Sequence, residues 1–418
     1  MLPKKCDVAI IGGGIIGVTT AMECAERGLS VVLVEKGRIA GEQSSRNWGW
    51  VRKTGRDPRE VPLILEARKA WAGMDERIGE ETGFRICGIA FAAENEKKFA
   101  EYEKWLQSVS QYDIGAKLIS GKDTASLIPH LEKPVAGALY TQDDARAEPS
   151  LAVPTMAKYL RRLGVSIIEN CAARSFETSA GRISSLITEH GEIHCQAIVL
   201  AGGFWARRFL GNHHVNFPQL GVTNSVMRTK PFDGPSISLW NKDFAWRKCL
   251  DGGYTLAHGS VHVGDLTPDY FRQFFSFVHH TFSNDEAVRL RIGKRFIEEA
   301  KLARHWQPDA ISPFEQVRVL DPVPFPHILR KAHRKMSEFA PIFAKAEIAE
   351  SWAGMIDVTP DAVPVIDEVP GFPGLILSAG YSGHGFGIGP GAGKLTADLL
   401  MKTAPIVDPE PFRFSRFK

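Results

Sequence analysis

The residues with the clearest chemical role stand near the start of the chain, where three glycines are followed by an acid. Gly12, Gly14 and Gly17 have the spacing G-x-G-x-x-G, and Glu35 follows about 20 residues later. In this pattern the first glycine permits a tight turn, the second lets backbone approach a pyrophosphate, and the third lets a helix pack on a sheet. The acid about 20 residues after the glycines accepts hydrogen bonds from ribose hydroxyls. The spacing therefore predicts a dinucleotide site.

Such a site needs a strand, a helix and a second strand to hold it, and residues 6–35 have that pattern. An apolar run precedes Gly12, an amphipathic stretch begins near Ile15, and a second apolar run ends at Glu35. The first N–H groups of the helix, at Ile15 and Ile16, and its positive dipole end would then face the phosphates. We predict a complete βαβ unit here, since strand, helix, second strand and acid in register rarely arise by chance.

Two more apolar runs end in glycines, at Gly202 and Gly380. Ligands of an open α/β sheet lie beyond the carboxyl ends of its strands, so three such turns predict a cofactor lying across the sheet. A flavin dinucleotide is long enough to contact all three. In the last turn, Gly383, Gly385 and Gly387 would let the backbone pack against a flat ring, and the following helix dipole would stabilise negative charge on a reduced flavin.

Composition excludes several other classes of protein. The chain has 418 residues, 51 basic against 48 acidic, and a formal charge of +3, which argues against nucleic acid as a partner. The six cysteines are scattered without C-x-x-C or His/Cys spacing, so we expect neither a metal site nor disulfides. They are Cys6, Cys24, Cys87, Cys171, Cys195 and Cys249.

The sequence gives no sign of a membrane-spanning segment. The first strand begins close to Met1, and later stretches lack about 18 uninterrupted apolar residues. We therefore expect a cytoplasmic protein. For the aromatic stretch YFRQFFSFV at 270–278, the pattern favours a half-buried helix over contact with a membrane surface.

The pattern along the chain predicts an α/β fold of two interleaved units: an FAD-binding, Rossmann-like doubly wound domain and an α+β substrate domain on a mainly antiparallel sheet. We expect one helix over 61–77, a strand after the amphipathic stretch 155–163, a hairpin over 183–194, and helices over 271–280 and 287–302. The FAD-binding domain would comprise residues 1–84, 146–218 and 345–418, and the substrate domain 85–145 and 219–344.

The chain also resembles a known family. The βαβ segment, the loop EKGRIAGEQSSRNWGW at 35–50 and AGYSGHGFGIGP at 379–390 together resemble the glycine oxidase and D-amino-acid oxidase family of FAD-dependent amine oxidoreductases. Within that family, EKGRIAGEQSSR, ENCAARSFETSAGRIS, SPFEQVR and the ending LTADLLMKTAPIVDPEPFRFSRF look like L-amino acid deaminases. The likeness covers nearly the whole chain and is weakest over 85–145 and 225–300. Its motifs are specific for FAD and much less so for substrate.

The loop over 38–50, where some relatives carry a histidine that attaches the flavin, contains none, so we expect non-covalent FAD. The resemblance assigns contacts to this cofactor. After the pyrophosphate turn at Gly12, Gly14 and Gly17, the chain reaches the positions for the ribose and for the part next to the adenine, at Glu35 and Lys36. The loop over 44–50 would pass over the pyrophosphate and reach the isoalloxazine. Later residues would contact the adenine, the ribityl chain and the pyrimidine end of the flavin. In chain order the FAD residues are Gly12, Gly14, Ile15, Ile16, Gly17, Glu35, Lys36, Ser44, Ser45, Arg46, Gly49, Trp50, Ala173, Gly202, Gly380, Gly383, His384, Gly385 and Phe386.

The same resemblance implies a substrate pocket, from which this chain departs at two positions. Gly259 stands where the deaminases have a carboxylate-binding arginine, and Trp50 stands where they have a glutamine. The chain as given also begins without their N-terminal membrane-directing extension. Trp352 matches a pocket tryptophan, with core packing as the alternative.

Other cations remain available for a substrate carboxylate. Arg52 directly follows the flavin loop, His258 is next to the lost arginine, and Arg318 lies in SPFEQVR. We favour Arg52, which directly follows the flavin loop. His384, in the last glycine turn, is expected to contact the ring or product.

These observations predict oxidation of the C–N bond of an amino acid or related secondary amine, by hydride transfer to flavin N5. The imine would hydrolyse to a keto acid and ammonia or an amine, and oxygen, a quinone or a partner protein would reoxidise the flavin. The sequence shows no obvious general base. Two alternatives stay open: a flavin subunit of a multisubunit opine or hydroxyproline dehydrogenase, and a subunit that holds FAD without turnover. The chain could form homo- or hetero-oligomers.

Overall fold

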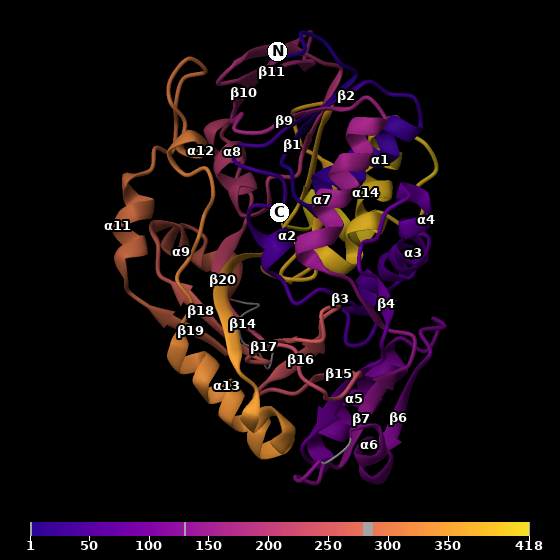
Figure 1. The fold of residues 1–418 in the computed structure, drawn as a ribbon. Helices are drawn as coiled ribbons and strands as arrows, with labels where there is room; N and C mark the ends of the chain where they lie inside the picture. The colour runs from indigo at the N-terminus through magenta and orange to yellow at the C-terminus, as the bar shows by residue number, and fades with distance from the viewer. Residues whose placement is uncertain (1, 129–130, 279–286, 418) are drawn as a thin grey trace.

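A computed structural model describes residues 2–128, 131–278 and 287–417 of the chain. Its first unit, in the upper half of Figure 1, is a six-stranded sheet in the order β21-β22-β13-β1-β2-β9. Its strands are β1 (Val8–Ile11), β2 (Val31–Val34), β9 (Ser166–Ile168), β13 (Ala197–Leu200), β21 (Val365–Glu368) and β22 (Leu375–Ala379). All neighbours pair in parallel except β21 and β22. The doubly wound sheet of the prediction is confirmed.

The three strands that end in glycine turns lie side by side in this sheet. β22, β13 and β1 are successive parallel neighbours, so their carboxyl ends share one edge. Helix α1 (Ile15–Glu26) follows the first turn, α8 (Ala206–Asn212) follows the second, and α14 (Gly385–Met401) follows the third. The turn at Gly12 needs glycine, because its φ is +112° and a Cβ there would lie 2.4 Å from the Ala201 carbonyl oxygen.

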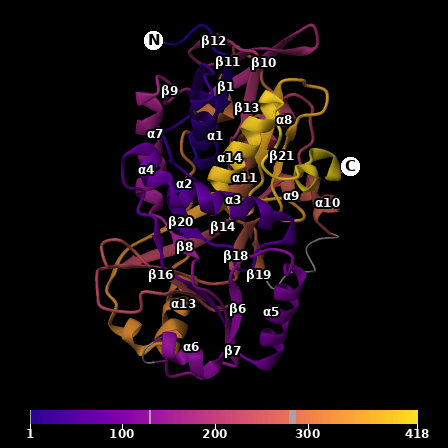
Figure 2. The same cartoon turned by 90° about the vertical axis from the view of Figure 1, so that its right-hand side faces the viewer.

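Helix α14 packs closely between α1 and α3 (Val61–Ala72), and its glycines make this possible (Figure 2). A Cβ on Gly393 would lie 2.5 Å from Thr19 Oγ1, and one on Gly391 would lie 2.7 Å from the Leu63 carbonyl oxygen. Thr19 Oγ1 also donates to the Gly389 carbonyl, at 3.0 Å. The glycine run therefore serves helix packing beyond the cofactor contact that the sequence suggested.

The second unit, in the lower half of Figure 1, is a mainly antiparallel ten-stranded sheet, as predicted. Its strands are β5 (Ile89–Ala93), β6 (Ala116–Ser120), β7 (Gly137–Thr141), β14 (Leu220–Thr229), β15 (Ser238–Trp240), β16 (Ala245–Lys248), β17 (Tyr254–Ala257), β18 (Val261–Asp265), β19 (Ala287–Arg291) and β20 (Ile348–Val358). Helices α5 (Glu96–Ser108), α6 (Gly121–Leu127) and α13 (Pro326–Phe339) pack on it. β20 pairs along the length of β14 and leads the chain back to the first unit.

Smaller elements complete the fold. The predicted hairpin is present within the sheet β10-β11-β12, and a second small sheet has the order β3-β8-β4. Their strands are β3 (Trp50–Val51), β4 (Arg85–Ile86), β8 (Ala145–Arg146), β10 (Ala173–Ser179), β11 (Arg182–Thr188) and β12 (Gly191–His194). The remaining α-helices are α2 (Gln43–Arg46), α4 (Met74–Ile78), α7 (Pro149–Arg162), α9 (Pro268–Arg272), α10 (Phe274–Val278), α11 (Lys294–Lys301) and α12 (Pro313–Gln316). Short 3₁₀ turns include η1 (Pro58–Glu60) and η2 (Gly203–Trp205).

Three predicted helices differ from the structure. The helix over 61–77 is divided at Gly73 into α3 and α4. The helix over 287–302 begins only at Lys294, because residues 287–291 form β19, a parallel neighbour of β18. The aromatic stretch forms two short helices, and no side chain of α10 is buried; Phe275 is 82% exposed. The end of that predicted helix, 279–280, lies outside the described residues.

Within the described ranges, the structure contains no helix long and apolar enough to cross a membrane. It also contains no group of His, Cys, Asp and Glu side chains suited to a metal ion in those ranges.

The close contact between α14 and α1 predicts that one methyl group added at Gly393 destabilises the fold. Replacing Gly393 with Ala places a Cβ against Thr19, so we expect Gly393→Ala to lower the free energy of unfolding by about 1–3 kcal/mol. Gly211→Ala on α8 is the matched control, because no atom lies within 4 Å of its Cβ position. That substitution should stabilise the chain by up to about 1 kcal/mol. Thermal unfolding of both variants measures the difference, and equal effects would contradict the packing argument.

Candidate functional site

One cavity of about 750 Å³ runs along the shared carboxyl edge of β1, β13 and β22 and continues to the ten-stranded sheet. Its walls come from the β1–α1 turn, the loop over 35–50, the start of α14, and side chains of β14, β18 and β20. Segments far apart in the sequence therefore meet around one space, as the three glycine turns predicted.

The structure places most of the predicted site residues in the wall of this cavity. Those that line it are Gly12, Gly14, Ile15, Ile16, Glu35, Lys36, Ser44, Arg46, Trp50, Arg52, Ala173, Gly202, Gly383, His384, Gly385 and Phe386. The predicted residues outside the lining are Gly17, Ser45, Gly49, His258, Trp352 and Gly380. Gly17 acts behind the wall, where a Cβ would lie 2.0 Å from the Gly12 carbonyl oxygen.

Glu35 lies at the end of β2 with its carboxylate turned to the glycine turn. One oxygen accepts from the Gly13 N–H and the other from the Gly37 N–H, each at 2.7 Å. Burial raises the pKa of the Glu35 carboxyl, although both N–H groups favour its ionised form. Each carboxylate oxygen has a second lone pair, so this position still suits the hydroxyls of a ribose.

The loop over 38–46 is held over the start of α1 by side chains that bind backbone. Ser44 Oγ accepts from the Ile15 N–H at 2.8 Å, which places a hydroxyl at the helix N-terminus. Arg46 donates to the carbonyl oxygens of Leu320 and Ala353, at 2.8 and 3.2 Å. This part of the cavity therefore offers an anion the N–H groups and dipole of α1, while Arg46 fixes the loop.

Lys36 has a similar structural role. Its Nζ donates to Glu42 Oε1 at 2.6 Å and to the carbonyl oxygens of Val317 and Arg318 at 2.8 and 2.9 Å. The Arg318 side chain in turn forms a two-pronged ion pair with Glu189 and lies outside the cavity lining. Both cations tie the loop to the segment after α12.

The other end of the cavity contains a buried acid that sequence reasoning missed. Asp357, on β20, accepts from the Gly380 N–H at 2.8 Å and from Gln219 Nε2 at 3.1 Å. Burial raises the pKa of Asp357 to about 6. Its contact with Gly380 explains that glycine's place behind the wall: it anchors the turn that carries residues 383–387 to the cavity. A lone Asp in a strand gave no sequence signal.

Two predicted substrate residues lie outside the cavity lining. His258 is buried, burial lowers its pKa to about 4, and its Nε2 has no hydrogen-bond partner among the described residues. Trp352 donates its indole N–H to the Arg46 carbonyl oxygen at 3.1 Å, so it supports the loop. Gly259 does line the cavity, but a Cβ there would lie 1.7 Å from the Asn241 carbonyl oxygen, which leaves no room for an arginine.

An aromatic wall closes the part of the cavity next to Trp50. Trp48 and Trp50 meet edge to face with ring centroids 5.1 Å apart, and Phe91 lies 5.0 Å from Trp240. Phe91 also lies under the Arg52 guanidinium, at 5.4 Å from the ring centroid. Local patterns did not reveal this wall, because its members come from the loop before β3 and from β3, β5 and β15.

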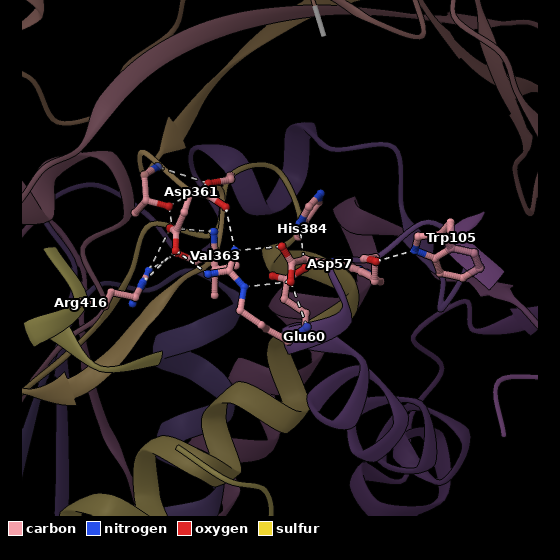
Figure 3. A network of polar contacts seen from close by, with 11 residues as sticks. Asp57, Glu60, Trp105, Asp361, Val363, His384 and Arg416 are labelled. Carbon is pink, nitrogen blue, oxygen red and sulfur yellow. Dashed lines mark hydrogen bonds and ion pairs between the residues drawn. The ribbon is translucent and has the colours of Figure 1, made fainter. Parts of the chain in front are cut away.

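Glu60 is a second acid that sequence reasoning missed. It is fully buried behind His384, and its Oε2 lies 3.1 Å from His384 Nδ1, as Figure 3 shows. The two residues are 324 positions apart, so only the fold brings them together.

Comparison with known families agrees with this geometry. A family model described as FAD dependent oxidoreductase (DAO) matches residues 7–399. The chain belongs to this family. FAD is therefore its cofactor, as the glycine turns and Glu35 predicted.

Among solved structures, L-amino acid deaminase from Proteus myxofaciens, in complex with anthranilate, is similar with a TM-score of 0.95 and 33% identity over 100% of this chain and 94% of that one. Mitochondrial sarcosine dehydrogenase of Mus musculus is 24% identical over 100% of this chain but only 42% of its own length, so the chain spans about two fifths of that relative. Sarcosine oxidase subunit beta of Arthrobacter sp is 22% identical over 100% of this chain and 92% of its own length.

The residues present fit FAD on structural grounds. Glu35 would supply a carboxylate for a ribose, and the start of α1 would supply N–H groups for a pyrophosphate. At Gly14 a Cβ would lie 3.0 Å from Ser44 Oγ, so the absence of a side chain lets the loop and the backbone approach closely there. The start of α14 directs its N–H groups and dipole toward the same cavity.

The position of Glu35 predicts a large effect on cofactor affinity. Glu35→Ala removes a charged acceptor of ribose hydroxyls, worth about 1.5–3 kcal/mol per hydrogen bond, so FAD affinity should fall at least about tenfold. Titration of the folded apoprotein with FAD measures it. Glu192→Ala, on the exposed face of β12, is the control and should bind FAD like the parent. Equal affinity in both variants would rule out the ribose contact.

The loop sequence also predicts a non-covalent cofactor. Residues 38–50 contain no histidine, and no cysteine is found among the described residues that line the cavity. Acid precipitation of the holoprotein should release all flavin absorbance to the supernatant. Colour that stays with the precipitated chain would show a covalent bond.

Proposed function

We propose that this chain oxidises the C–N bond of an amino acid or related secondary amine. The observation that carries the proposal is the continuity of one cavity from the FAD-binding turns to an aromatic wall with Arg52 beside it. FAD, when bound, supplies the acceptor for a hydride from the substrate's α-carbon. The chain's own residues then have to bind the substrate, orient its α-carbon and exclude water. The resulting imine would hydrolyse to a keto acid and ammonia or an amine.

Arg52 is our candidate for the substrate carboxylate. It lines the cavity, donates to the Thr54 carbonyl oxygen, and lies over the Phe91 ring. A guanidinium has five N–H donors in a fixed fork, which suits bidentate binding of a carboxylate. The backbone around Gly259 leaves no space for a clamp from that side, so a cation from the segment after β3 takes its place.

Similarity to sarcosine oxidase subunit beta supports a second candidate, the flavin subunit of a multisubunit dehydrogenase. In that case the electron acceptor would be a partner protein or quinone rather than oxygen. Co-purification of further chains with this one would favour it. A chain that holds FAD without turnover is the third possibility. The cytoplasmic location of the protein stays a prediction from the sequence.

An anaerobic panel of amines tests the proposal. The panel contains large L-amino acids, their D-forms, N-methyl amino acids, proline analogues and opines. Only a narrow subset of these compounds should remove the oxidised-flavin absorbance of the holoprotein, because the wall around Trp50 and Gly259 restricts the pocket. If no amine reduces the flavin, the chain is not an amine oxidoreductase. Rapid reduction by most large L-amino acids would contradict the narrow specificity.

Arg52→Ala should raise the apparent Kd of the active substrate at least about tenfold while FAD stays bound, since a hydrogen bond to a charged group is worth about 1.5–3 kcal/mol. Arg85→Ala is the control, because Arg85 is exposed and pairs with Glu81 outside the cavity lining. An unchanged Arg52→Ala variant would exclude this residue as the carboxylate site.

A further inference from the structure

A buried acid, Glu60, and a histidine at the cavity wall, His384, form a hydrogen-bonded pair. Glu60 ends η1 just before α3, and its side chain is 0% exposed. His384 is the N-cap residue of α14, lines the cavity, and keeps 22% of its side chain exposed. Oε2 of the acid lies 3.1 Å from Nδ1 of the ring, and Figure 3 shows the second ring nitrogen directed away from Glu60.

The surroundings keep Glu60 ionised. Burial opposes its negative charge, but the charge of a protonated His384 ring, the hydrogen bond from that ring and the charge of Arg56 together lower the pKa of the Glu60 carboxyl below its ordinary value. Arg56 is itself buried, with Nη1 3.7 Å from Glu60 Oε2, and its Nε donates to the Arg52 carbonyl oxygen at 3.1 Å. The cation is thus fixed to the segment that also carries Arg52.

Other charged groups near His384 are engaged with one another. Asp57 forms an ion pair with Arg59, which lowers the pKa of the Asp57 carboxyl against the effect of burial, and Arg59 also pairs with Asp361. Figure 3 shows this second network beside the first. On its own segment the His384 N–H donates to the Tyr381 carbonyl oxygen at 2.7 Å, and burial raises the pKa of the Tyr381 phenol. Glu60 is therefore the carboxylate in hydrogen-bond contact with the His384 ring.

An ionised carboxylate can only accept a hydrogen bond, so Nδ1 of His384 carries the hydrogen in this contact. In a neutral imidazole the lone pair then lies on Nε2, the nitrogen that faces away from Glu60. The arrangement is that of a base held by a buried acid, as in the aspartate–histidine part of a hydrolase triad, where the acid fixes the tautomer and stabilises the imidazolium.

We propose that Glu60 is a positioning residue that holds His384 in its Nδ1–H tautomer, so that Nε2 accepts the proton of the substrate's ammonium group. This rests on the proposed oxidation of an amine. The N–H bond of the ammonium breaks, an Nε2–H bond forms, and the electron pair left on the substrate nitrogen becomes available for the C=N bond. Glu60 stabilises the imidazolium until the proton passes to water after turnover.

The tautomer can be measured without any turnover. In holoprotein labelled with ¹⁵N-histidine, His384→Gln identifies the His384 signals among those of the 13 histidines. Correlations between ring nitrogens and ring protons should show Nδ1 protonated in the neutral ring of the parent. In Glu60→Gln, Arg56 would donate to the amide oxygen, and the amide NH₂ would face Nδ1 as a hydrogen-bond donor. Nδ1 must then accept with its lone pair, so the ring should change to the Nε2–H tautomer. An Nε2–H tautomer in the parent would overturn the proposal.

Anaerobic reduction of the flavin by an amine from the panel tests the proton transfer. Glu60→Gln should lower the limiting rate about 10²–10⁴-fold near neutral pH, the range for loss of a general base. Its rate should recover about tenfold per pH unit as free amine replaces ammonium, whereas the parent should level off at lower pH. Glu60→Asp should restore part of the rate. Glu66→Gln is the control, since Glu66 pairs with the exposed Lys69 on α3 outside the cavity lining.

The outcomes separate the two proposals. A Glu60→Gln variant with the parent's rate and pH profile would leave amine oxidation in place and refute the role of Glu60. If Glu60→Gln does not retain FAD, His384→Asn takes its place and should show the same dependence on free amine. If no amine reduces the flavin, the proposed function fails, and an Nε2–H tautomer in the parent would independently refute the positioning by Glu60.

Discussion

The fold depends on how closely backbone can approach backbone along the edge where β1, β13 and β22 end. The Gly12 carbonyl oxygen lies 2.0 Å from the place of a Cβ on Gly17, and α14 meets α1 where a Cβ on Gly393 would lie 2.5 Å from Thr19 Oγ1. Dense packing of this kind leaves no tolerance for one additional methyl group. Because α1 is near the start of the chain and α14 near its end, their contact brings both ends of the FAD-binding unit to one cavity.

Elements with a strong local period were predictable, and those decided by tertiary contact were not. The apolar runs of β1, β2, β13 and β22 revealed the parallel sheet, since strands buried on both faces read as continuous apolar stretches. The helix predicted over 287–302 starts as β19 instead, because its first residues pair with β18, and pairing with a distant strand overrides weak local preference.

The residues of the candidate site also fall into a group that was predictable from local sequence and a group that was not. Glycine turns and the acid after β2 have fixed spacing, so Glu35 and its neighbours could be assigned from the sequence. Asp357 and Glu60 could not, because each is a single acid whose hydrogen-bond partner in the site, Gly380 or His384, belongs to another segment of the chain. His258 shows the opposite error: its place next to Gly259 suggested the pocket, but its side chain is buried outside the cavity lining.

Charge is arranged differently at the two ends of the cavity. At the end next to α1, Lys36 and Arg46 donate to carbonyl oxygens and to the carboxylates of Glu42 and Asp321, which leaves helix N–H groups to meet an anion. At the other end, Arg56 and Glu60 form a buried ion pair, and His384 contacts Glu60 from the cavity wall. Removing charges from water is costly, and a buried ion pair is weak evidence for stability by itself. Glu60 Oε1 even lacks a hydrogen-bond partner among the described residues. A buried ion pair placed directly behind a histidine of the cavity wall is explained more simply by what it does to that histidine than by what it contributes to stability.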